Sequence, residues 1–283
     1  MRLLFAGLAT VDLVQRVERF PGPDEKVQSA SVDVAAGGPA ANAAVTAAAL
    51  GATVTLVSAV GAHPLGDLVR ADLATHGVTL IDIAADSPEP PPVSAVTVLA
   101  STGERTIVSR NAGNRTVAAP ADGLPDADLT LVDGHHPGLA VAAARSARRL
   151  LVDAGSWRPV FADVFPHAEV VACSGDFRHP DATAGTDEAT AAAVRAVGVT
   201  NVVITHGPEP VHWYGPAGTR GSVPVPVVSA VDTAGAGDAF HGALAVALAR
   251  GDLDLKATIA YASRIAAIRV THAGPRAWLS HLP

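Results

Sequence analysis

Short apolar runs alternate with alanine-rich, helix-like stretches along most of the chain. The apolar runs predict strands at residues 3–8, 53–60, 128–132, 150–152, 170–173, 202–205 and 225–231. The alanine-rich stretches predict helices at residues 40–50, 65–76, 139–149, 188–197, 239–250 and 255–270. This alternation is typical of a mostly parallel sheet that is covered by helices on both faces. The sequence therefore predicts an α/β fold.

Two segments break the alternation and predict a second, smaller sheet. Residues 14–34 end in alternating apolar and polar positions, and residues 93–110 alternate around a turn signal at residues 101–104. Strands this amphipathic do not suit a sheet that is buried on both faces. We expect residues 14–34 and 93–110 to form a small antiparallel sheet. Residues 1–13, 35–92 and 111–283 would then form the α/β core.

Composition and charge exclude several classes of protein. The net charge is −7, so there is no basic stripe to meet a nucleic acid, and we expect no such partner. Lysine occurs only at Lys26 and Lys256, which excludes a P-loop of the form G-x-x-x-x-G-K-[ST]. The single Cys173 excludes an internal disulfide framework and fits a reducing compartment. We therefore expect a cytoplasmic protein.

The N-terminus is apolar, as the hydrophobic region of a signal peptide also is. Only Arg2 supplies positive charge there, and Asp12 interrupts the apolar run before any small-residue cleavage site. A first buried strand is the better interpretation. No segment approaches 18 uninterrupted apolar residues, so we expect no membrane span.

The run Asp232-Thr233-Ala234-Gly235-Ala236-Gly237-Asp238 carries the strongest chemical signal. It follows the β-branched run at residues 225–231 and leads into an alanine-rich helix. Glycines let a ligand approach the main chain, and unpaired amides at a helix start bind anions such as phosphate. Asp238 would repel a phosphate there. Its presence in the first helical turn therefore indicates a chemical task, the removal of a proton from an attacking hydroxyl.

The sequence D-T-A-G-A-G-D resembles the C-terminal signature of the ribokinase-like, or PfkB, carbohydrate kinases. Residues 37–43 and the Leu50-Gly51 pair resemble their N-terminal signature, G-G-x-x-x-N-x-A. The two motifs occur in the family's order, and the similarity covers residues 7–274. The resemblance implies a mostly parallel sheet flanked by helices, with the small sheet acting as a lid. It implies transfer of the γ-phosphoryl group of ATP, with Mg²⁺, to a sugar hydroxyl.

The resemblance also assigns roles to matching residues. Asp12, Gly38 and Asn42 would bind the sugar. Asp238 would be the base, and the amides of Gly235, Ala236 and Gly237 would face the transferred phosphoryl group. Thr205, Gly207 and Thr233, together with Gly235, would border the nucleotide.

This sequence departs from the family in its metal and nucleotide motifs. The usual N-x-x-E reads Ser174-Gly175-Asp176-Phe177, so Asp176 is the acid left to reach Mg²⁺ through water. The nucleotide loop ends in proline, which makes it stiffer. A monovalent cation, K⁺, would lie near Asp232.

The prediction of the acceptor sugar depends on likeness to particular subgroups of the family. Within the family, the chain looks most like the sulfofructose kinases and the ketohexokinases, which implies a fructose-like acceptor. If Lys26, Arg110 and His135 converge, the far end of the pocket is cationic and favours an anionic ketose. Two alternatives stay open: a nucleoside kinase, and a non-catalytic sensor that binds a sugar or nucleotide. We also expect a homodimer that forms through the lid.

Overall fold

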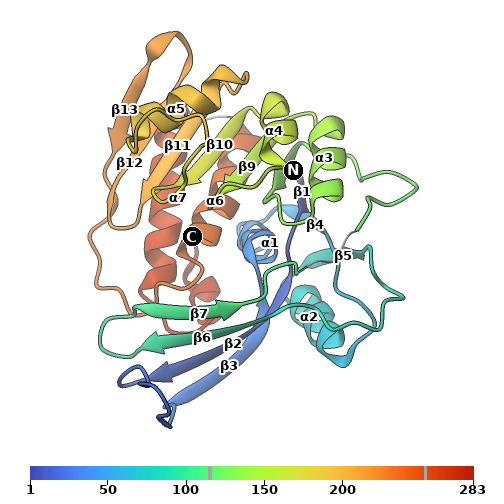
Figure 1. Cartoon of the computed structure of the whole chain (residues 1–283), viewed down its shortest axis with the longest axis vertical. Coiled ribbons are helices and arrows are strands. Elements are labelled where there is room, and N and C mark those ends of the chain that lie inside the picture. Colours follow the sequence, from blue (N-terminus) through green and yellow to red (C-terminus); the bar gives the residue numbers. More distant parts are fainter. Residues whose placement is uncertain (114–116, 252–253) are drawn as a thin grey trace.

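A computed structural model describes residues 1–113, 117–251 and 254–283 (Figure 1). Its larger sheet has nine strands in the order β13-β12-β11-β10-β9-β8-β1-β4-β5. All neighbours from β11 to β5 pair in parallel, and β12 and β13 add antiparallel pairs at one edge. The strands are β1 (Arg2–Ala6), β4 (Thr53–Ser58), β5 (Val78–Asp82), β8 (Leu129–Val132), β9 (Leu150–Ala154), β10 (Val170–Ser174), β11 (Asn201–His206), β12 (Glu209–Tyr214) and β13 (Arg220–Val223).

Helices cover both faces of this sheet. They are α1 (Pro39–Ala49), α2 (Pro64–Thr75), α3 (Pro137–Ser146), α4 (Phe161–Val164), α5 (Asp187–Ala196), α6 (Ala236–Arg250) and α7 (Leu255–Val270), with 3₁₀ turns η1 (Phe165–His167), η2 (Pro216–Gly218) and η3 (Ala277–His281). Side chains alternate between the two faces of a strand. Leu3 and Phe5 of β1 pack in one core with α1, α2, α6 and α7, whereas Leu4 and Ala6 pack in the other with α3, α4 and α5.

A separate four-stranded sheet lies against the core and contains the segments predicted as the lid, a name kept for it below (Figure 1). Its order is β3 (Ser31–Gly37), β2 (Thr10–Val17), β6 (Val93–Leu99) and β7 (Arg105–Ser109). The β2–β3 and β6–β7 pairs are antiparallel, but the central β2–β6 pair is parallel. Both central strands leave the carboxyl ends of parallel core strands, β1 and β5, so they enter the lid in the same direction.

The predicted fold class is confirmed, with corrections at particular elements. The lid strands extend further than predicted: β2 begins at Thr10, and β3 ends at Gly37. Residues 225–231 are not a strand. Pro224 and Pro226 remove backbone donors there, and the Val227 side chain is fully exposed. The sequence prediction also omitted β5, β12, β13 and α4, because their patterns are short or mixed.

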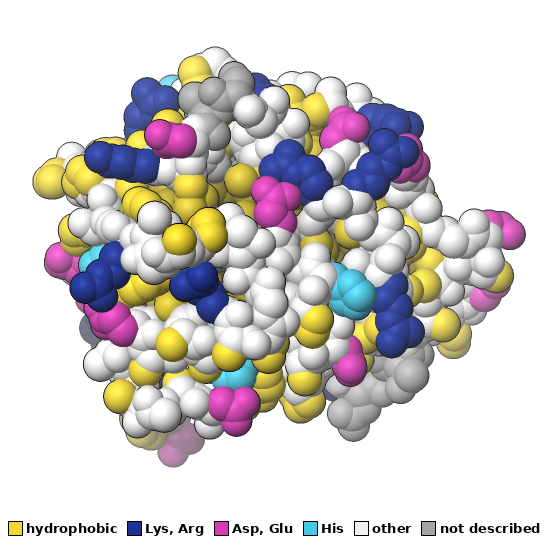
Figure 2. Space-filling model, turned by 90° about the horizontal axis from the view of Figure 1, so that it is seen from above, with side chains coloured by type: hydrophobic (Ala, Val, Ile, Leu, Met, Phe, Trp, Pro, Cys, Tyr) yellow, Lys and Arg dark blue, Asp and Glu magenta, His cyan; other side chains and the backbone are white. Residues whose placement is uncertain are grey.

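The protein has a net charge of −7, and charged side chains of both signs are mixed on its surface (Figure 2). On the face drawn in Figure 2, Lys and Arg side chains lie among Asp and Glu side chains and do not gather into a stripe. In the described parts of the chain, no helix is long and apolar enough to cross a membrane.

Candidate active site

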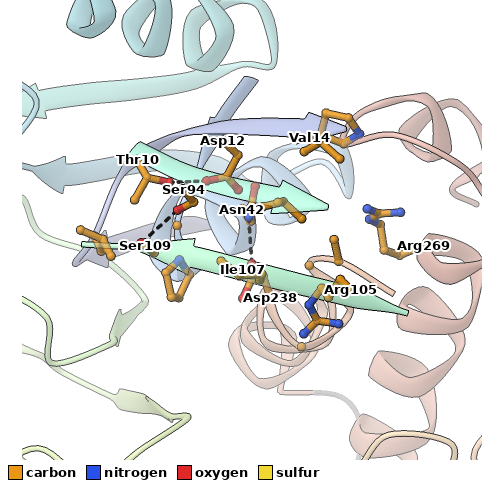
Figure 3. A pocket seen from close by; sticks show the side chains of 18 of the residues that line it. Thr10, Asp12, Val14, Asn42, Ser94, Arg105, Ile107, Ser109, Asp238 and Arg269 are labelled. Carbon is orange, nitrogen blue, oxygen red and sulfur yellow. Dashed lines mark hydrogen bonds between the residues drawn. The ribbon is translucent and has the colours of Figure 1, made fainter. Parts of the chain in front are cut away.

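A cavity of about 280 Å³ lies between the inner face of the lid and the carboxyl-end edge of the core (Figure 3). The inner lid face contributes side chains from β2, β6 and β7, and the core contributes the starts of α1 and α6 and the end of α7. The lining residues used below are Thr10, Asp12, Gly38, Asn42, Ser94, Arg105, Ser109, His135, Asp232, Gly235, Gly237, Asp238, Arg269 and Arg276. Residues far apart in the sequence therefore meet in one cavity, whose wall also includes apolar side chains such as Val96 and Ile107.

The start of α6 forms one wall of the cavity. Gly235 caps the helix with φ 70°, a left-handed conformation that glycine adopts without strain. Gly235, Gly237 and Asp238 line the cavity, as the motif predicts. Ala236 does not line it, and its N–H lies 3.4 Å from the Thr233 carbonyl. The helix start therefore presents backbone amides and one carboxylate to a ligand.

Asp238 has the properties of a base. Burial raises its pKa to about 6, and the nearby Asp153 carboxylate adds to the rise. A hydrogen bond from Asn42 partly lowers the Asp238 pKa again, because Asn42 Nδ2 donates to Asp238 Oδ2 at 2.8 Å. His241 lies behind the site, one turn along α6, with its Nδ1 3.1 Å from Asp153 Oδ2. A carboxyl group whose pKa lies close to neutral pH can accept a proton without holding it too tightly.

Asp12 stands on the lid wall of the same cavity (Figure 3). It lies within β2. Thr10 Oγ1 donates a 2.6 Å hydrogen bond to Asp12 Oδ1, and Ser94 Oγ donates a 3.1 Å hydrogen bond to Ser109 Oγ. Burial raises the Asp12 pKa, although hydrogen bonds from Thr10 and Ser94 oppose this. These oxygens can bind the hydroxyls of a sugar.

The start of α1 places Asn42 between Asp238 and Arg276. Gly38 caps the helix with φ 92°, and a Cβ there would lie 2.6 Å from the Leu8 carbonyl oxygen, so glycine is required. Arg276 Nη1 donates to Asn42 Oδ1 at 3.2 Å, and its Nη2 pairs with Asp72 Oδ2 at 2.8 Å. Arg276 thus fixes which end of the Asn42 amide faces Asp238.

The lid also contacts the motif directly. Arg105 Nη1 donates to the Thr233 carbonyl at 2.7 Å, and Thr233 Oγ1 donates to the Gly103 carbonyl at 2.9 Å. The β6–β7 hairpin is therefore fastened to the loop that precedes α6. Arg105 places a positive charge close to the predicted phosphoryl site.

These positions can be compared with known proteins. A family model described as pfkB family carbohydrate kinase matches residues 2–281. The chain belongs to the pfkB family of carbohydrate kinases. Members of this family transfer a phosphoryl group from ATP to an alcohol, and this chain is such a phosphotransferase.

Three relatives show how fully the chain matches this family. It is 28% identical to a ribokinase of Bacillus subtilis, over 95% of this chain and 92% of that protein. It is also 28% identical to an ATP-dependent ribose-1-phosphate kinase of Halopiger xanaduensis, over 98% and 94%. A crystal structure of a putative ribokinase from Agrobacterium tumefaciens superposes with a TM-score of 0.83 at 26% identity, over 98% and 94%.

The expected monovalent cation of the family does not fit this chain. Arg269 is buried and its Nη2 lies 3.3 Å from Asp232 Oδ2. Its Nη1 donates to the carbonyls of Asp232 and His272 at 3.4 and 3.0 Å. The guanidinium thus occupies the oxygens that a K⁺ ion would need. The assignment of Asp232 to a cation is corrected accordingly: its partner is Arg269.

Lys26, Arg110 and His135, predicted to form a cationic end of the substrate pocket, do not come together. His135 lines the cavity, but its Nε2 lies 2.6 Å from Arg158 Nη2, and its Nδ1 lies 3.2 Å from Asp133 Oδ1. Lys26 is exposed in the β2–β3 connection, and Arg110 is exposed after β7. Neither Lys26 nor Arg110 lines the cavity. The reason is local: Lys26 lies in a long connection, and Arg110 follows the last inward position of β7.

The predicted nucleotide and Mg²⁺ residues lie at neighbouring strand ends. Thr205 is near the end of β11, and Gly207, with φ 61°, begins the two-residue turn into β12. The predicted loop is therefore a tight hairpin, with glycine at the turn position that needs positive φ. Asp176 is exposed just after β10. None of these three lines the cavity.

Sequence reasoning missed several cavity residues of this family member. Ser94 lies on the inner face of β6, directly across from Asp12 in the β2–β6 register. The period-2 alternation could have identified its face, but not its partner strand. Arg105 and Arg276 carry no motif of their own, and only the folded chain brings them to the cavity.

Proposed function

We propose that this family member is an ATP-dependent kinase for a neutral monosaccharide, a pentose or a ketohexose. One observation carries the proposal: Asp238, with its raised pKa, lines the same small cavity as Asp12, Ser94 and Ser109. Its volume lies just below the roughly 300–1,000 Å³ of drug-sized ligand pockets, which suits one monosaccharide.

The residues divide the chemistry between the two walls. Asp12 and the hydroxyls beside it would hold the sugar through the hydroxyls that do not react. Asn42 would hold Asp238 in place, and Asp238 would take the proton from the attacking hydroxyl. The amides of Gly235 and Gly237, with the Arg105 guanidinium, would stabilise charge on the transferred phosphoryl group. In this scheme the protein mainly positions groups and supplies charge.

The polar groups on the cavity wall favour a neutral acceptor over an anionic one. Two carboxylates, Asp12 and Asp238, face the bound molecule. Of the three arginines that line the cavity, Arg269 pairs with Asp232, Arg276 pairs with Asp72, and Arg105 would serve the transferred phosphoryl group, so none is left for an anionic end of the acceptor. Lys26 and Arg110 are elsewhere. The likeness to sulfofructose kinases stays a prediction. The named relatives favour a five-carbon sugar: the ribokinase is named for a neutral one, and the ribose-1-phosphate kinase for an anionic one.

The nucleotide would lie beside Thr205, Gly207 and Thr233, with its phosphates toward the start of α6. Mg²⁺ binds mainly to phosphate and water oxygens in sites of this kind, and Asp176 would reach its waters. In the reducing cytoplasm, which the lone Cys173 fits, ATP would arrive with this ion.

The experiment is an acceptor panel in which ADP release is measured with ATP and Mg²⁺. Neutral pentoses and ketohexoses should be turned over most efficiently, measured as kcat/KM. Sugar acids, sulfonated ketoses and nucleosides should be poorer acceptors. A clear preference for an anionic sugar or a nucleoside would contradict the neutral-sugar proposal, and no ADP release with any acceptor would favour the sensor alternative.

We also propose that two copies pair through the outer face of the lid. Val34, Leu13, Ala95 and Val108 are neighbours across all four lid strands. They lie on the face opposite the Asp12–Ser94–Ser109 row that lines the cavity. Val34 and Val108 are 47% and 73% exposed. A continuous apolar row on an exposed sheet is typical of a protein interface.

A further inference from the structure

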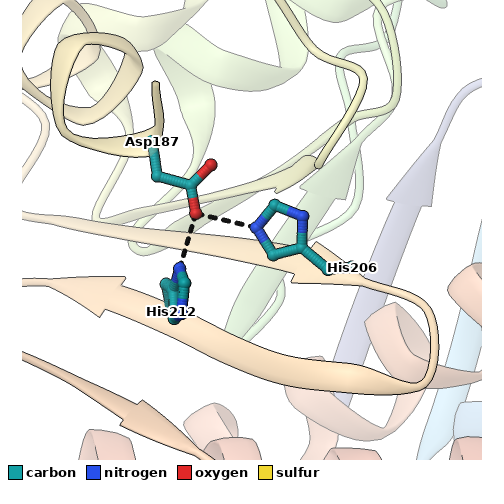
Figure 4. Close-up of side chains that lie close together, drawn as sticks. All are labelled: Asp187, His206 and His212. Atoms are coloured by element: carbon teal, nitrogen blue, oxygen red, sulfur yellow. Dashed lines mark hydrogen bonds and ion pairs between the residues drawn. The ribbon is translucent and has the colours of Figure 1, made fainter. Parts of the chain in front are cut away.

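A second group of reactive side chains lies outside the sugar cavity. Asp187 begins α5, His206 ends β11 and His212 lies in β12. Asp187 Oδ2 lies 2.7 Å from His206 Nε2 and 2.6 Å from His212 Nδ1 (Figure 4). Two imidazoles therefore converge on one carboxylate oxygen.

The fold brings these residues together through strand register. His206 is two residues beyond Ile204, so both side chains point to the same face of β11. His212 pairs with Ile204 across the β11–β12 hairpin and points to that face as well. Ile204 packs in the core that α5 covers. Asp187, in the first turn of α5, is thus placed above both histidines.

The chemistry of this cluster is that of a metal site. One ligand atom from each of the three residues lies within 4.8 Å of the others. Two imidazoles and a carboxylate are a ligand set of Zn²⁺ and similar transition metals, whereas Mg²⁺ prefers oxygen ligands alone. In a tetrahedral complex the ligand atoms are about 3.3–3.6 Å apart, since each lies roughly 2.0–2.2 Å from the ion. Asp187 Oδ2 would therefore need to move away from each imidazole nitrogen by somewhat less than about 1 Å.

The three side chains are partly exposed to solvent, and packing of the His206 ring holds that side chain in place. The side chains of Asp187, His206 and His212 are 20%, 28% and 43% exposed, so an ion can enter and keep water ligands. The His206 ring rests against the turn after β10, where a Cβ on Gly175 would lie 2.4 Å from its Nδ1.

We propose that Asp187, His206 and His212 form a binding site for one divalent transition-metal ion of the Zn²⁺ type. The site is separate from the cavity between the lid and the core, because none of its three residues lines that cavity. The bound ion would join α5 to the β11–β12 hairpin and replace the shared hydrogen bonds by three metal–ligand bonds. Three protein ligands leave further positions for water or another small ligand.

The test is a Zn²⁺ competition titration against a chromophoric chelator, on the full chain without an affinity tag and without nucleotide or sugar. Wild type should bind one Zn²⁺ per chain. His212→Gln and Asp187→Asn should each weaken binding by at least about tenfold, because even the loss of an outer-shell partner costs roughly 10–100-fold in metal affinity. The matched control is His281→Gln, which removes one histidine of the other close pair, His272–His281, and should bind as wild type does.

Two further measurements keep the result interpretable. Zn²⁺ should raise the melting temperature of wild type and of His281→Gln but not of His212→Gln, and circular dichroism checks that each variant is folded. Co²⁺ should give wild type a visible absorption band that His212→Gln lacks. Equal Zn²⁺ affinity in wild type and folded His212→Gln, or no uptake by wild type, would overturn the proposal. Because no turnover is measured, this outcome is independent of the kinase proposal.

Discussion

At the scale of single residues, Asp238 combines a position with a perturbed ionisation. It lies in the first turn of α6 beside the amides of Gly235 and Gly237, and it accepts a hydrogen bond from Asn42. Burial and Asp153 raise its pKa to about 6. The same environment that makes it a base also makes its ionised form costly. The ionisation of Asp238 should therefore affect both the pH dependence of kcat/KM and the stability of the fold.

The activity prediction concerns pH. The base must be ionised to accept a proton, so kcat/KM should be constant above neutral pH and fall about tenfold per unit below pH 6. A pH profile of kcat/KM with a neutral sugar measures this. A profile whose acidic limb begins near pH 4, the ordinary range of a carboxyl group, would contradict the raised pKa.

The stability prediction concerns Asp238→Asn. A carboxyl group whose folded pKa is raised destabilises the fold above that pKa, and the penalty is relieved as the pH falls from about 6 toward the unfolded value of 3.8. The uncharged variant avoids a penalty of roughly 1–3 kcal/mol. Its melting temperature should exceed that of wild type at pH 8, and the gap should shrink at pH 5.

The exposed Asp176→Asn is the control for this measurement and should leave the melting temperature almost unchanged. An Asp238→Asn variant that melts below wild type at pH 8 would show that the ionised carboxylate is not strained by its surroundings.

The sequence predicted the residues of the site that belong to motifs. Asp12, Gly38, Asn42, Gly235, Gly237 and Asp238 all line the cavity. The prediction that Lys26 and Arg110 line the cavity was wrong, because the direction of a side chain in a loop or at a strand end depends on the tertiary path. The sequence also failed for Asp232, since a buried arginine 37 residues later in the chain cannot be paired with it from spacing alone.

At the scale of elements, the end of α7 and the loop before α6 form one charged unit. Asp232 Oδ2 accepts from the Gly274 N–H at 3.1 Å as well as from Arg269, and its Oδ1 accepts from the Ala234 N–H at 3.0 Å. Its carboxylate is therefore satisfied by groups of the protein itself. Arg269 supplies the positive charge that a bound ion would otherwise bring to this place.

We therefore predict that turnover does not depend on K⁺. Replacing KCl by tetramethylammonium chloride at equal ionic strength should change kcat by less than about twofold, because screening is unchanged and no ion is lost. Steady-state ADP release in the two salts is the measurement. Strong activation by K⁺ that Na⁺ does not reproduce would mean that a cation binds despite Arg269.

Elements were predicted best where one pattern dominates over a long stretch. Residues 255–270 were predicted as a helix and form α7 with the same bounds. The edge strands β12 and β13 were missed, since prolines and glycines interrupt them and pairing stabilises them only in the folded sheet. The parallel β2–β6 pair was not predicted because it depends on where the core releases each strand.

At the scale of the whole molecule, the lid has two faces with different tasks. Its inner face carries Asp12, Ser94 and Ser109 toward the cavity, and its outer face carries the apolar row that includes Val34 and Val108. Pairing of two copies through the outer face would hold the inner face in position over the sugar. Assembly and substrate binding would then be linked.

We predict that the protein sediments as a dimer at micromolar concentration. Val108→Asp places a charge on the β7 end of the proposed interface and should shift the protein to monomer, because a buried unpaired charge costs several kcal/mol. Val227→Asp is the matched control, since Val227 is equally apolar, fully exposed and outside both sheets. A wild-type monomer, or equal dissociation by both variants, would contradict a lid interface.

The most direct test of the account is the turnover of Asp238→Asn with a saturating neutral sugar that wild type phosphorylates. The carboxamide keeps the shape of the side chain but cannot take the proton, so kcat should fall by about 10²–10⁴-fold. Sugar affinity, measured separately by calorimetry, should change far less. Near-normal turnover in this variant would contradict the assignment of Asp238 as the base, and with it the mechanism proposed for this cavity.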